Sequence, residues 1–276
     1  MESTVERALA FLDAHGRPVE RAWARHRLTD GPRTDLVEAL GAYQNPDGGF
    51  GQALEPDIKA PASQAFAARL AMHVLLSIGA AAEEPIVRRL EGWLEADQGE
   101  DGDWRFPPEV YRHELAPWFA GWTFPSLNPA LCLAGLATRL GIGSNRLHGR
   151  VRDLAGRLAS TPEIGEGGFY TLLPYAEYVP WVEHPEREAY LAALVDRIAA
   201  DARAGAYDDA GHFFEHAGPP DGEIALSLPP EVIAAQLDRL LAEQQEDGGW
   251  PTPYDPAWRS WATASALATL QDYGRI

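Results

Sequence analysis

The chain has 276 residues, of which 46% are hydrophobic, so it can bury the core of one large domain. Its formal net charge of −18 argues against nucleic-acid and anionic-membrane partners, which require basic surfaces. Lys59 is the only lysine, which is typical of a GC-rich bacterial genome. The single cysteine, Cys132, predicts no internal disulfide. The absence of a signal-peptide pattern and of a long apolar run predicts a cytoplasmic protein without a membrane span.

The hydrophobic pattern along the chain is helical almost throughout. Two helices are expected at the N-terminus, Val5–Ala14 and Pro18–Arg27. Helices with one polar face are expected at Asp35–Tyr43, Ala82–Ala96, Asn145–Ser160, Pro185–Ala204 and Pro230–Gln245. Helices that are apolar on all sides, and therefore buried, are expected at Ala62–Ile78, Pro129–Leu140 and Trp258–Tyr273. Long non-helical segments are expected at Gln52–Ala60, Arg105–Asn128, Ala206–Pro229 and Pro251–Ala257.

This alternation predicts an all-α fold, an α/α toroid of the α6/α6 type with outer amphipathic and inner apolar helices. We expect about twelve helices and a single domain over residues 1–276. Residues 1–30 would form an N-terminal helical pair, and residues 31–276 would form the repeats. The long segments would then gather at one rim of the barrel, where binding and catalytic residues are commonly found.

Near-copies of one glycine-rich motif separate the helices. The clearest are Gln44–Gly51 and Gln245–Trp250, with a weaker copy at Gln98–Trp104. Decayed copies are expected at Glu166–Tyr170 and Tyr207–Glu215. In such a motif, glycine ends the helix with a positive φ, aspartate bonds nearby N–H groups, and glutamine bridges neighbouring backbone ends. The final aromatic residue packs between helices, so Phe50 and Trp250 are predicted to be buried and structural.

The pattern Q-x-x-D-G-G-[FW] resembles the QW repeat of the terpenoid cyclase and protein prenyltransferase superfamily. Leu54–Lys59 and Asp247–Arg259 are similar to stretches of the bacterial prenyltransferase/squalene-oxidase repeat proteins. The resemblance extends from about Arg33 to Ile276. It implies the toroid fold and a terpene-cyclase-like or prenyl-processing activity on an apolar substrate.

The catalytic signatures of these relatives are missing from the chain. The D-x-D-D motif of alkene-protonating cyclases is absent, and its nearest match is Ala206–Ala210. Asp208 and Asp209 lack the third aspartate of the diphosphate-binding D-D-x-x-D motif. Cys132 lacks the Asp and His neighbours that hold zinc in protein prenyltransferases. The chemistry of the family therefore cannot be assigned to residues of this chain by motif.

The segment Glu109–Phe124 has the highest density of candidate ligand-binding side chains. Aromatic rings stabilise cations and line apolar pockets, although the same rings could instead fill the barrel mouth. Tyr170, Tyr175, Tyr178 and Trp181 form a second aromatic group with the same two interpretations. The predicted substrate-binding residues are Tyr111, Arg112, His113, Trp118, Phe119, Trp122, Phe124, Tyr175, Trp258 and Arg259.

Four carboxylates are candidate acids or bases: Asp57, Asp208, Asp209 and Asp255. Burial would raise the pKa of such a group towards the range of a general acid, whereas the alternative is a helix-capping or turn carboxylate. The cations Lys59, Arg105, Arg112 and Arg259 could hold an anion or pair with neighbouring carboxylates.

The segment His212–His216 matches H-x-x-E-H, a zinc-protease pattern, but flanking glycine and proline leave room for only about one helical turn. We therefore expect no metal and no cofactor. Three functions remain open: an enzyme acting on an isoprenoid-like substrate, a non-catalytic module that binds a hydrophobic ligand or a protein, and a carbohydrate-active barrel. The last rests on the likeness of Gly248–Pro251 to a Gly-Gly-Trp-Pro stretch of pectate lyases with an α/α toroid.

Overall fold

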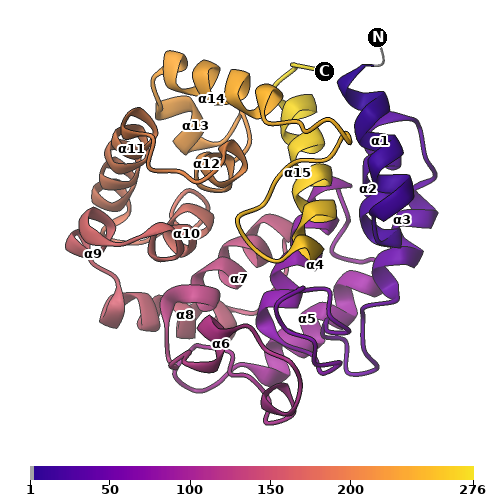
Figure 1. Cartoon of the computed structure of the whole chain (residues 1–276). Coiled ribbons are helices and arrows are strands. Elements are labelled where there is room, and N and C mark those ends of the chain that lie inside the picture. Colours follow the sequence, from indigo (N-terminus) through magenta and orange to yellow (C-terminus); the bar gives the residue numbers. More distant parts are fainter. Residues whose placement is uncertain (1–2) are drawn as a thin grey trace. The chain divides into compact units, whose positions relative to one another are not determined.

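The computed structural model describes residues 3–276 and is built from helices (Figure 1). That part of the chain contains no strand, and its isolated β-bridges join Gln44 to Phe50 and Ile58 to Leu115. The all-α prediction is confirmed. The α-helices are α1 (Thr4–His15), α2 (Pro18–Leu28), α3 (Arg33–Gly41), α4 (Ala65–Ser77), α5 (Pro85–Asp97), α6 (Pro117–Ala120), α7 (Leu127–Leu140), α8 (Asn145–Leu158), α9 (Thr161–Glu166), α10 (Phe169–Tyr178), α11 (Arg187–Ala204), α12 (Ala210–Ala217), α13 (Glu223–Ser227), α14 (Pro230–Ala242) and α15 (Arg259–Asp272); the 3-10 helices are η1 (Val110–Arg112) and η2 (Pro256–Trp258).

Every helix expected from the hydrophobic pattern is present. Residues 3–276 contain fifteen α-helices against the roughly twelve expected, and α6, α9 and α13 are short helices that the hydrophobic pattern did not predict. The prediction that Ala206–Pro229 is non-helical is wrong, because the segment contains α12 and α13. The side chain of Asp209 caps α12 by accepting the N–H of His212. Aspartate is a preferred N-cap residue, and here it begins a helix.

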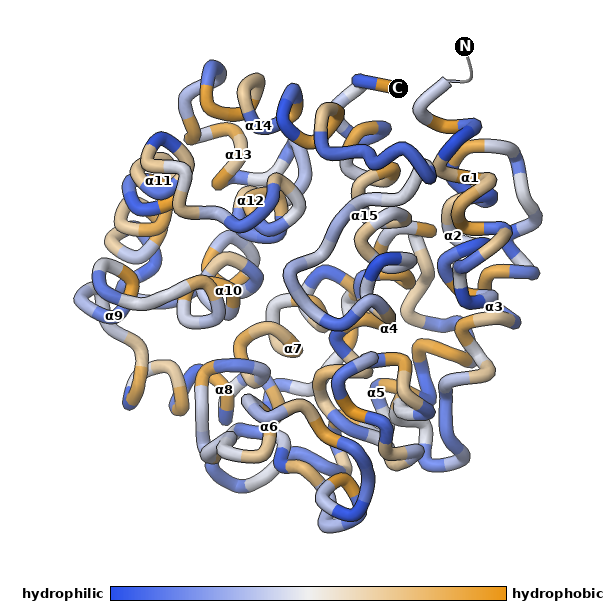
Figure 2. The backbone as a smooth tube through the Cα atoms, in the orientation of Figure 1, coloured by the Kyte–Doolittle hydropathy of each residue, from blue (hydrophilic) through white to orange (hydrophobic). Residues whose placement is uncertain are grey.

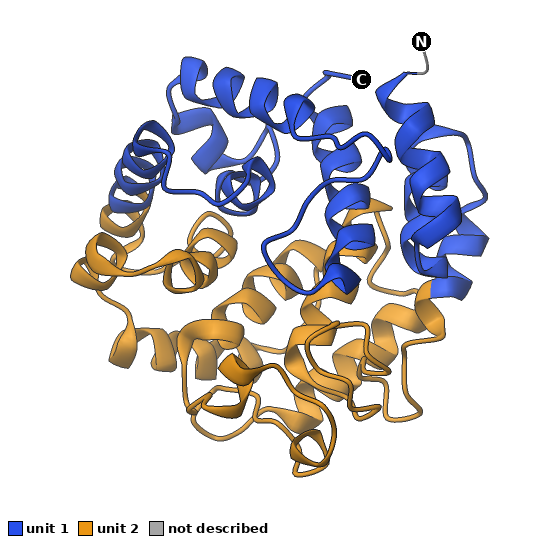
Figure 3. Ribbon diagram, viewed as in Figure 1, with its two compact units in different colours: residues 1–39, 192–276 blue, residues 40–191 orange. Residues whose placement is uncertain are grey.

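The chain forms two compact units (Figure 3). Unit 1 contains the residues up to Ala39 together with Ala192–Ile276, and unit 2 contains Leu40–Leu191. In unit 1, α15 packs against α1, α2, α12 and α14. Trp23 of α2 and Trp261 of α15 bring their rings to 5.2 Å. The two ends of the chain are therefore packed together in one unit.

Helix α7 is the centre of unit 2, where it packs against α4, α8 and α10. Twelve of its residues are buried, which agrees with the prediction of a helix that is apolar on all sides. A Cβ atom on Gly135 would lie 2.0 Å from the carbonyl oxygen of Glu177, so glycine is required where α10 crosses α7. Figure 2 shows that hydrophobic stretches follow helices such as α7, whereas the connection between α14 and α15 is mostly hydrophilic.

The glutamine of each motif links two helices through the backbone. The Gln44 side-chain amide donates to the carbonyl oxygens of Gly48 and of Ile86, at the start of α5. The Gln98 side-chain amide donates in the same way to the carbonyl oxygens of Gly102 and of Leu147, which lies in α8. In the last motif this role belongs to Gln244, whose side-chain amide donates to the carbonyl oxygens of Gly248 and of Thr4 in α1. Assigning Gln245 as the motif glutamine is therefore wrong by one position.

The glycine after each motif aspartate has a left-handed backbone and lies against the next helix. Gly48, Gly102 and Gly248 have φ between 91° and 95°. A Cβ atom on Gly248 would lie 2.2 Å from the carbonyl oxygen of Arg7, so both the conformation and the space require glycine. Glu166–Tyr170 and Tyr207–Glu215 lack this geometry. The former contains the start of α10, and the latter belongs largely to α12, so neither is a motif turn.

The motif aromatic residues are structural, as predicted. Phe50 is completely buried, and Trp250 is 2% exposed. The indole N–H groups of Trp104 and Trp250 donate to the carbonyl oxygens of Leu94 and Leu240, at 3.0 and 2.7 Å. These tryptophans therefore combine burial of a large apolar surface with a hydrogen bond to the preceding helix.

We expect Trp250→Ala to lower the free energy of unfolding by roughly 3–5 kcal/mol, because truncation of a buried aromatic residue leaves a cavity. Urea denaturation measures the loss. Trp118→Ala is the matched control, since that ring is half exposed and should cost far less. Equal and small effects in both variants would show that Trp250 does not support the fold.

Candidate functional site

The aromatic segment of unit 2 packs into a local hydrophobic core. The buried residues of this core are Ile58, Ala60, Phe66, Phe106, Val110 and Phe119. The partly buried side chains of Leu115, Ala116, Trp122 and Phe124 pack against them. The ring of Phe66 lies 4.7 Å from Phe119 and 5.1 Å from Trp122. Of the two interpretations of these rings, the structure therefore favours filling over lining for Phe119, Trp122 and Phe124.

Other residues of the predicted binding set lie at the surface. Tyr111 is 52% exposed and Trp118 is 48% exposed. Arg112 and His113 are also exposed, and His113 lies 3.9 Å from Glu109. These four side chains share one segment and are accessible to a partner or ligand.

The structure contradicts a ligand-lining role for Tyr175. The residue is completely buried, and its hydroxyl donates to Glu163 at 2.5 Å. The ring also packs against Tyr190 at 5.6 Å. Tyr175 therefore holds α10 to its neighbours, because its polar and apolar surfaces are both used internally.

The buried carboxyl group of Asp103 holds the chain just after the aromatic segment, at Ser126. Its two oxygens accept the N–H groups of Trp104, at 2.8 Å, and Ser126, at 2.7 Å. The Ser126 hydroxyl in turn accepts the indole N–H of Trp122. Burial raises the pKa of Asp103 to about 7, against the effect of the two hydrogen bonds and of Arg105, which lower it. Asp101 adds to the rise.

Because the folded protein holds the Asp103 proton more tightly than the unfolded chain, we expect this group to reduce stability as pH rises from about 4 to about 7. Asp103→Asn removes the titration. The stability of the variant relative to wild type should therefore improve by roughly 1 kcal/mol for each pH unit in this range and level off above it. Urea denaturation across the range measures the difference. A constant difference would mean that Asp103 is ionised throughout.

Three of the predicted acid or base candidates have structural positions. Asp255 caps η2 through the N–H of Ala257 at 2.8 Å, as expected for the alternative interpretation. The carbonyl oxygen of Asp57 accepts the N–H of Ala116, which joins its turn to the aromatic segment. Asp208 is exposed, and its carbonyl oxygen accepts from Arg239. None of these contacts places the carboxyl group in a catalytic arrangement.

Arg259 is occupied by its own motif. Its guanidinium donates to both carboxylate oxygens of Asp247 at 2.9 Å and stacks 4.6 Å from the ring of Phe11. The predicted role in binding an external anion therefore fails, because these contacts use the guanidinium internally. Trp258 beside it is half-buried, and its indole N–H has no hydrogen-bond partner among residues 3–276.

The fourth carboxylate, Asp209, belongs to a polar relay in unit 1. It lies at the start of α12 and caps that helix through His212 N–H at 2.9 Å. The same carboxylate oxygen lies 2.8 Å from Nδ1 of His212. Nε2 of His212 lies 3.1 Å from the hydroxyl of Tyr254, in the segment before η2. A carboxylate, an imidazole and a phenol thus follow one another within hydrogen-bond distance.

The electrostatics of the relay favour an ionised pair. Burial by itself lowers the pKa of His212, but Asp209, Glu215 and Asp208 outweigh it, so the pKa is raised. For Asp209, burial raises the pKa, and the hydrogen bond and charge of His212 outweigh it, so the pKa is lowered. The two side chains are 11% and 15% exposed, so solvent can reach the pair. An imidazole with a raised pKa can act as acid or base near neutral pH.

A second set of contacts fixes the loop that carries Asp209. Arg239 of α14 donates to the carbonyl oxygens of Tyr207 and Asp208 at 3.1 and 2.8 Å. It also pairs with Glu243, whose carboxylate accepts the N–H of Ala210. Side chains of α14 therefore hold the backbone on both sides of Asp209, at residues 207 and 208 before it and at Ala210 after it.

Helix α12 is longer than the single turn expected, and it does place His212 and His216 four residues apart. Each imidazole, however, is bonded to a tyrosine: His212 to Tyr254 and His216 to Tyr207, the latter at 2.9 Å. Within residues 3–276, no group of three His, Cys, Asp or Glu side chains has the arrangement of a metal site. Both imidazoles of the H-x-x-E-H pattern therefore lie within hydrogen-bond distance of tyrosine hydroxyls.

The sequence interpretation identified Asp209 but missed His212 and Tyr254 as its partners. It also missed a cluster in unit 2, formed by Arg69 and His73 of α4 and Glu177 of α10. A usable signal was present, since these charged residues interrupt helices that are otherwise apolar.

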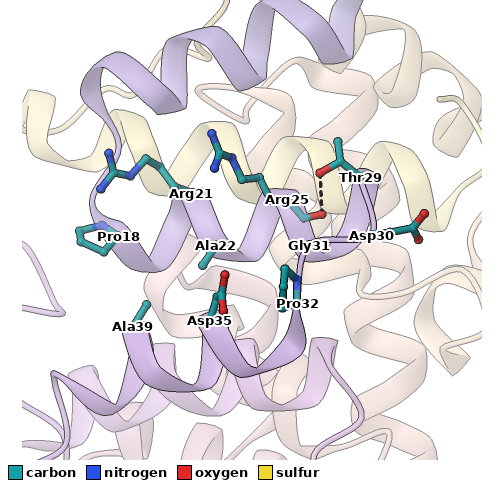
Figure 4. A pocket seen from close by; sticks show the side chains of 10 residues that line it. All are labelled: Pro18, Arg21, Ala22, Arg25, Thr29, Asp30, Gly31, Pro32, Asp35 and Ala39. Atoms are coloured by element: carbon teal, nitrogen blue, oxygen red, sulfur yellow. Dashed lines mark hydrogen bonds between the residues drawn. The ribbon is translucent and has the colours of Figure 1, made fainter.

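A groove of about 720 Å³ lies elsewhere in unit 1, beside α2 and α3 (Figure 4). Figure 4 shows the short side chains of Ala22 and Ala39 between the two helices, with Asp35 on α3 and Arg21 and Arg25 on α2. Arg25 pairs with Asp13 at 2.7 Å. The groove does not include the residues of the relay, and its mixed charges define no reaction.

Comparisons with known proteins bear on the fold. No family model matches the chain, and no curated protein matches it. A crystal structure of a protein from Actinoplanes is similar, with a TM-score of 0.57, 16% sequence identity and 98% of each chain covered. No helix among residues 3–276 is both long and apolar enough to cross a membrane. The likeness to the Actinoplanes protein extends over nearly the whole length of both chains and concerns the helical fold alone.

Proposed function

We propose that this protein is an enzyme that transfers protons at the Asp209–His212–Tyr254 relay. The observation that carries the proposal is the pair of contacts on the His212 imidazole, 2.8 Å to Asp209 and 3.1 Å to Tyr254. A carboxylate that orients an imidazole towards a hydroxyl group is a recurrent arrangement for acid–base catalysis. Asp209 fixes the orientation of the ring, and Nε2 is the atom that exchanges a proton.

The direction of transfer follows from the charges. When His212 is neutral with its hydrogen on Nδ1, that atom faces the Asp209 carboxylate at 2.8 Å, and Nε2 can accept a proton from Tyr254 or from a substrate bound at that hydroxyl. When His212 is charged, Nε2–H is a general acid stabilised by the Asp209 carboxylate. Tyr254 can relay the proton because its hydroxyl both donates and accepts.

The proposed substrate is an apolar, isoprenoid-like molecule with an oxygen function, held in a single α/α toroid. The QW-like repeats and the alternation of helices support the toroid and the substrate class. An imidazolium is too weak an acid to protonate an isolated alkene, so the reaction is placed at a hydroxyl, carbonyl or diphosphate oxygen. The proposed activity thus differs from alkene-protonating cyclisation in its acid and in its reacting atom.

A second candidate is non-catalytic binding at the aromatic segment of unit 2. Tyr111 and Trp118 are half exposed, although the segment around them is held by a buried core. Exposed rings on a rigid support suit an apolar ligand, a protein surface or the face of a sugar. Trp118→Ala should then weaken binding without lowering stability, which titration of tryptophan fluorescence measures.

We expect His212→Gln to abolish turnover of a substrate from a panel of prenyl alcohols, prenyl aldehydes, prenyl diphosphates, squalene and oxidosqualene. Tyr254→Phe should lower the rate by roughly 10²- to 10⁴-fold, the usual contribution of an acid–base group. Mass spectrometry of the products measures turnover, and calorimetry of the same variants measures binding.

His148→Gln is the matched control. Its imidazole bonds the carbonyl oxygen of Ile142 at 3.0 Å in unit 2, outside the relay, so turnover should be unchanged. A wild-type rate in His212→Gln would refute the relay. Absence of binding and turnover across the panel would refute the isoprenoid substrate and leave the binding module.

A further inference from the structure

Unit 2 contains a cluster of charged groups that the proposed function does not use. Nε and Nη2 of Arg69 donate to the Glu177 carboxylate, at 3.0 and 2.5 Å. Nε2 of His73 lies 2.8 Å from the same carboxylate. The Glu177 side chain is 6% exposed, Arg69 is 13% exposed and His73 is 30% exposed. A buried carboxylate thus joins two basic side chains that lie one helical turn apart on α4.

The position of Glu177 is fixed by packing. Helices α4 and α10 both pack on α7, and the close approach at Gly135 sets the backbone of Glu177. Burial raises the pKa of Glu177, but the charge of Arg69 and the hydrogen bonds from Arg69 and His73 outweigh it and hold the pKa well below its usual range. The carboxylate is therefore ionised at every physiological pH, and it can only accept hydrogen bonds.

An ionised Glu177 determines the tautomer of His73. Because Nε2 faces a group that only accepts, Nε2 must carry a hydrogen. In the neutral imidazole, Nδ1 is then a bare acceptor. No residue of the described range 3–276 donates to Nδ1, and the side chain is partly open to solvent.

His73 is not needed to balance the charge of Glu177. Arg69 already makes bidentate contact with Glu177, which neutralises the carboxylate. His73 adds an oriented base with one accessible nitrogen. The same combination of carboxylate and oriented imidazole occurs in the unit 1 relay, but there the second nitrogen already faces Tyr254.

The geometry points to a second proton-transfer site, in which Nδ1 of His73 accepts the proton of a hydroxyl group on a small ligand. The O–H bond of the ligand breaks and an N–H bond forms at Nδ1. The products are an oxyanion and an imidazolium whose Nε2–H remains bonded to Glu177. Arg69 is a positioning residue, since it holds the carboxylate and does not touch the ligand.

The tautomer can be measured in the wild-type protein without any substitution. Long-range proton–nitrogen NMR spectra of histidine-labelled protein, recorded at alkaline pH so that imidazoles are neutral, should show hydrogen on Nε2 of His73 and none on Nδ1. Glu177→Gln should allow both tautomers. A hydrogen on Nδ1 in the wild type would overturn the proposal, because no base would face the ligand.

Ligand deprotonation is tested with 4-nitrophenol, whose phenolate is yellow and whose neutral form is nearly colourless. Near neutral pH, the phenolate fraction of 4-nitrophenol should be higher when it is bound to the wild-type protein than when it is free, and His73→Gln should lose this increase. His212→Gln should retain it, which separates this site from the unit 1 relay. Equal signals in wild type and His73→Gln, or loss only in His212→Gln, would refute a site at His73.

Discussion

The motif glutamines are the constraint on which the rest of the structure depends. Each side-chain amide donates to a carbonyl oxygen of its own turn and to one at the start of another helix, as Gln44 does with Gly48 and Ile86. Because both acceptors are backbone carbonyl oxygens, a glutamine that donates to both limits the distance between the turn and the helix. Gln244 donates in the same way to the carbonyl oxygen of Thr4, so a hydrogen bond joins the first helix to the last motif. Unit 1 therefore contains both ends of the sequence.

Both candidate sites are supported by this framework of helices and turns. Asp209 lies where α12 begins, and backbone contacts from Arg239 hold the preceding residues. Glu177 lies where α10 crosses α7 at Gly135. In each case a carboxylate is placed by the backbone, and an imidazole is then oriented 2.8 Å from it. Rigid placement of the carboxylate restricts how each imidazole can lie, which both proposals require.

The sequence predicted the helices well because their signal is local. A stretch such as Pro129–Leu140 is apolar on all sides, and the structure buries α7 accordingly. The prediction failed where a helix starts inside a glycine-rich stretch, as α12 does after Asp209. The choice of Gln245 ignores the spacing of the motif, since the glutamine three positions before Asp247 is Gln244, as Gln44 is before Asp47. The bridge from Gln244 to Thr4 agrees with that spacing.

The candidate site could be predicted only in part, since its partners are distant in the sequence. Asp209 is a candidate in the sequence because it lies in a predicted rim loop close to a buried helix, whereas His212 enters there only as a possible metal ligand. Tyr254 lies 42 positions beyond His212 and becomes its partner through the fold alone. Likewise, 104 positions separate His73 from Glu177. Tyr175 was misjudged because an aromatic residue has the same appearance in a sequence whether it lines a site or fills a core.

The protonation of His212 tests the central claim most directly. NMR titration of histidine-labelled protein gives its pKa in the wild type and in Asp209→Asn. We predict a pKa above the ordinary value of about 6.5 in the wild type and a fall in the variant, because the hydrogen bond and charge of Asp209 no longer offset burial and only Glu215 and Asp208 still raise the pKa. An ordinary pKa that is the same in both proteins would contradict the ion pair, and with it the proposed acid–base relay.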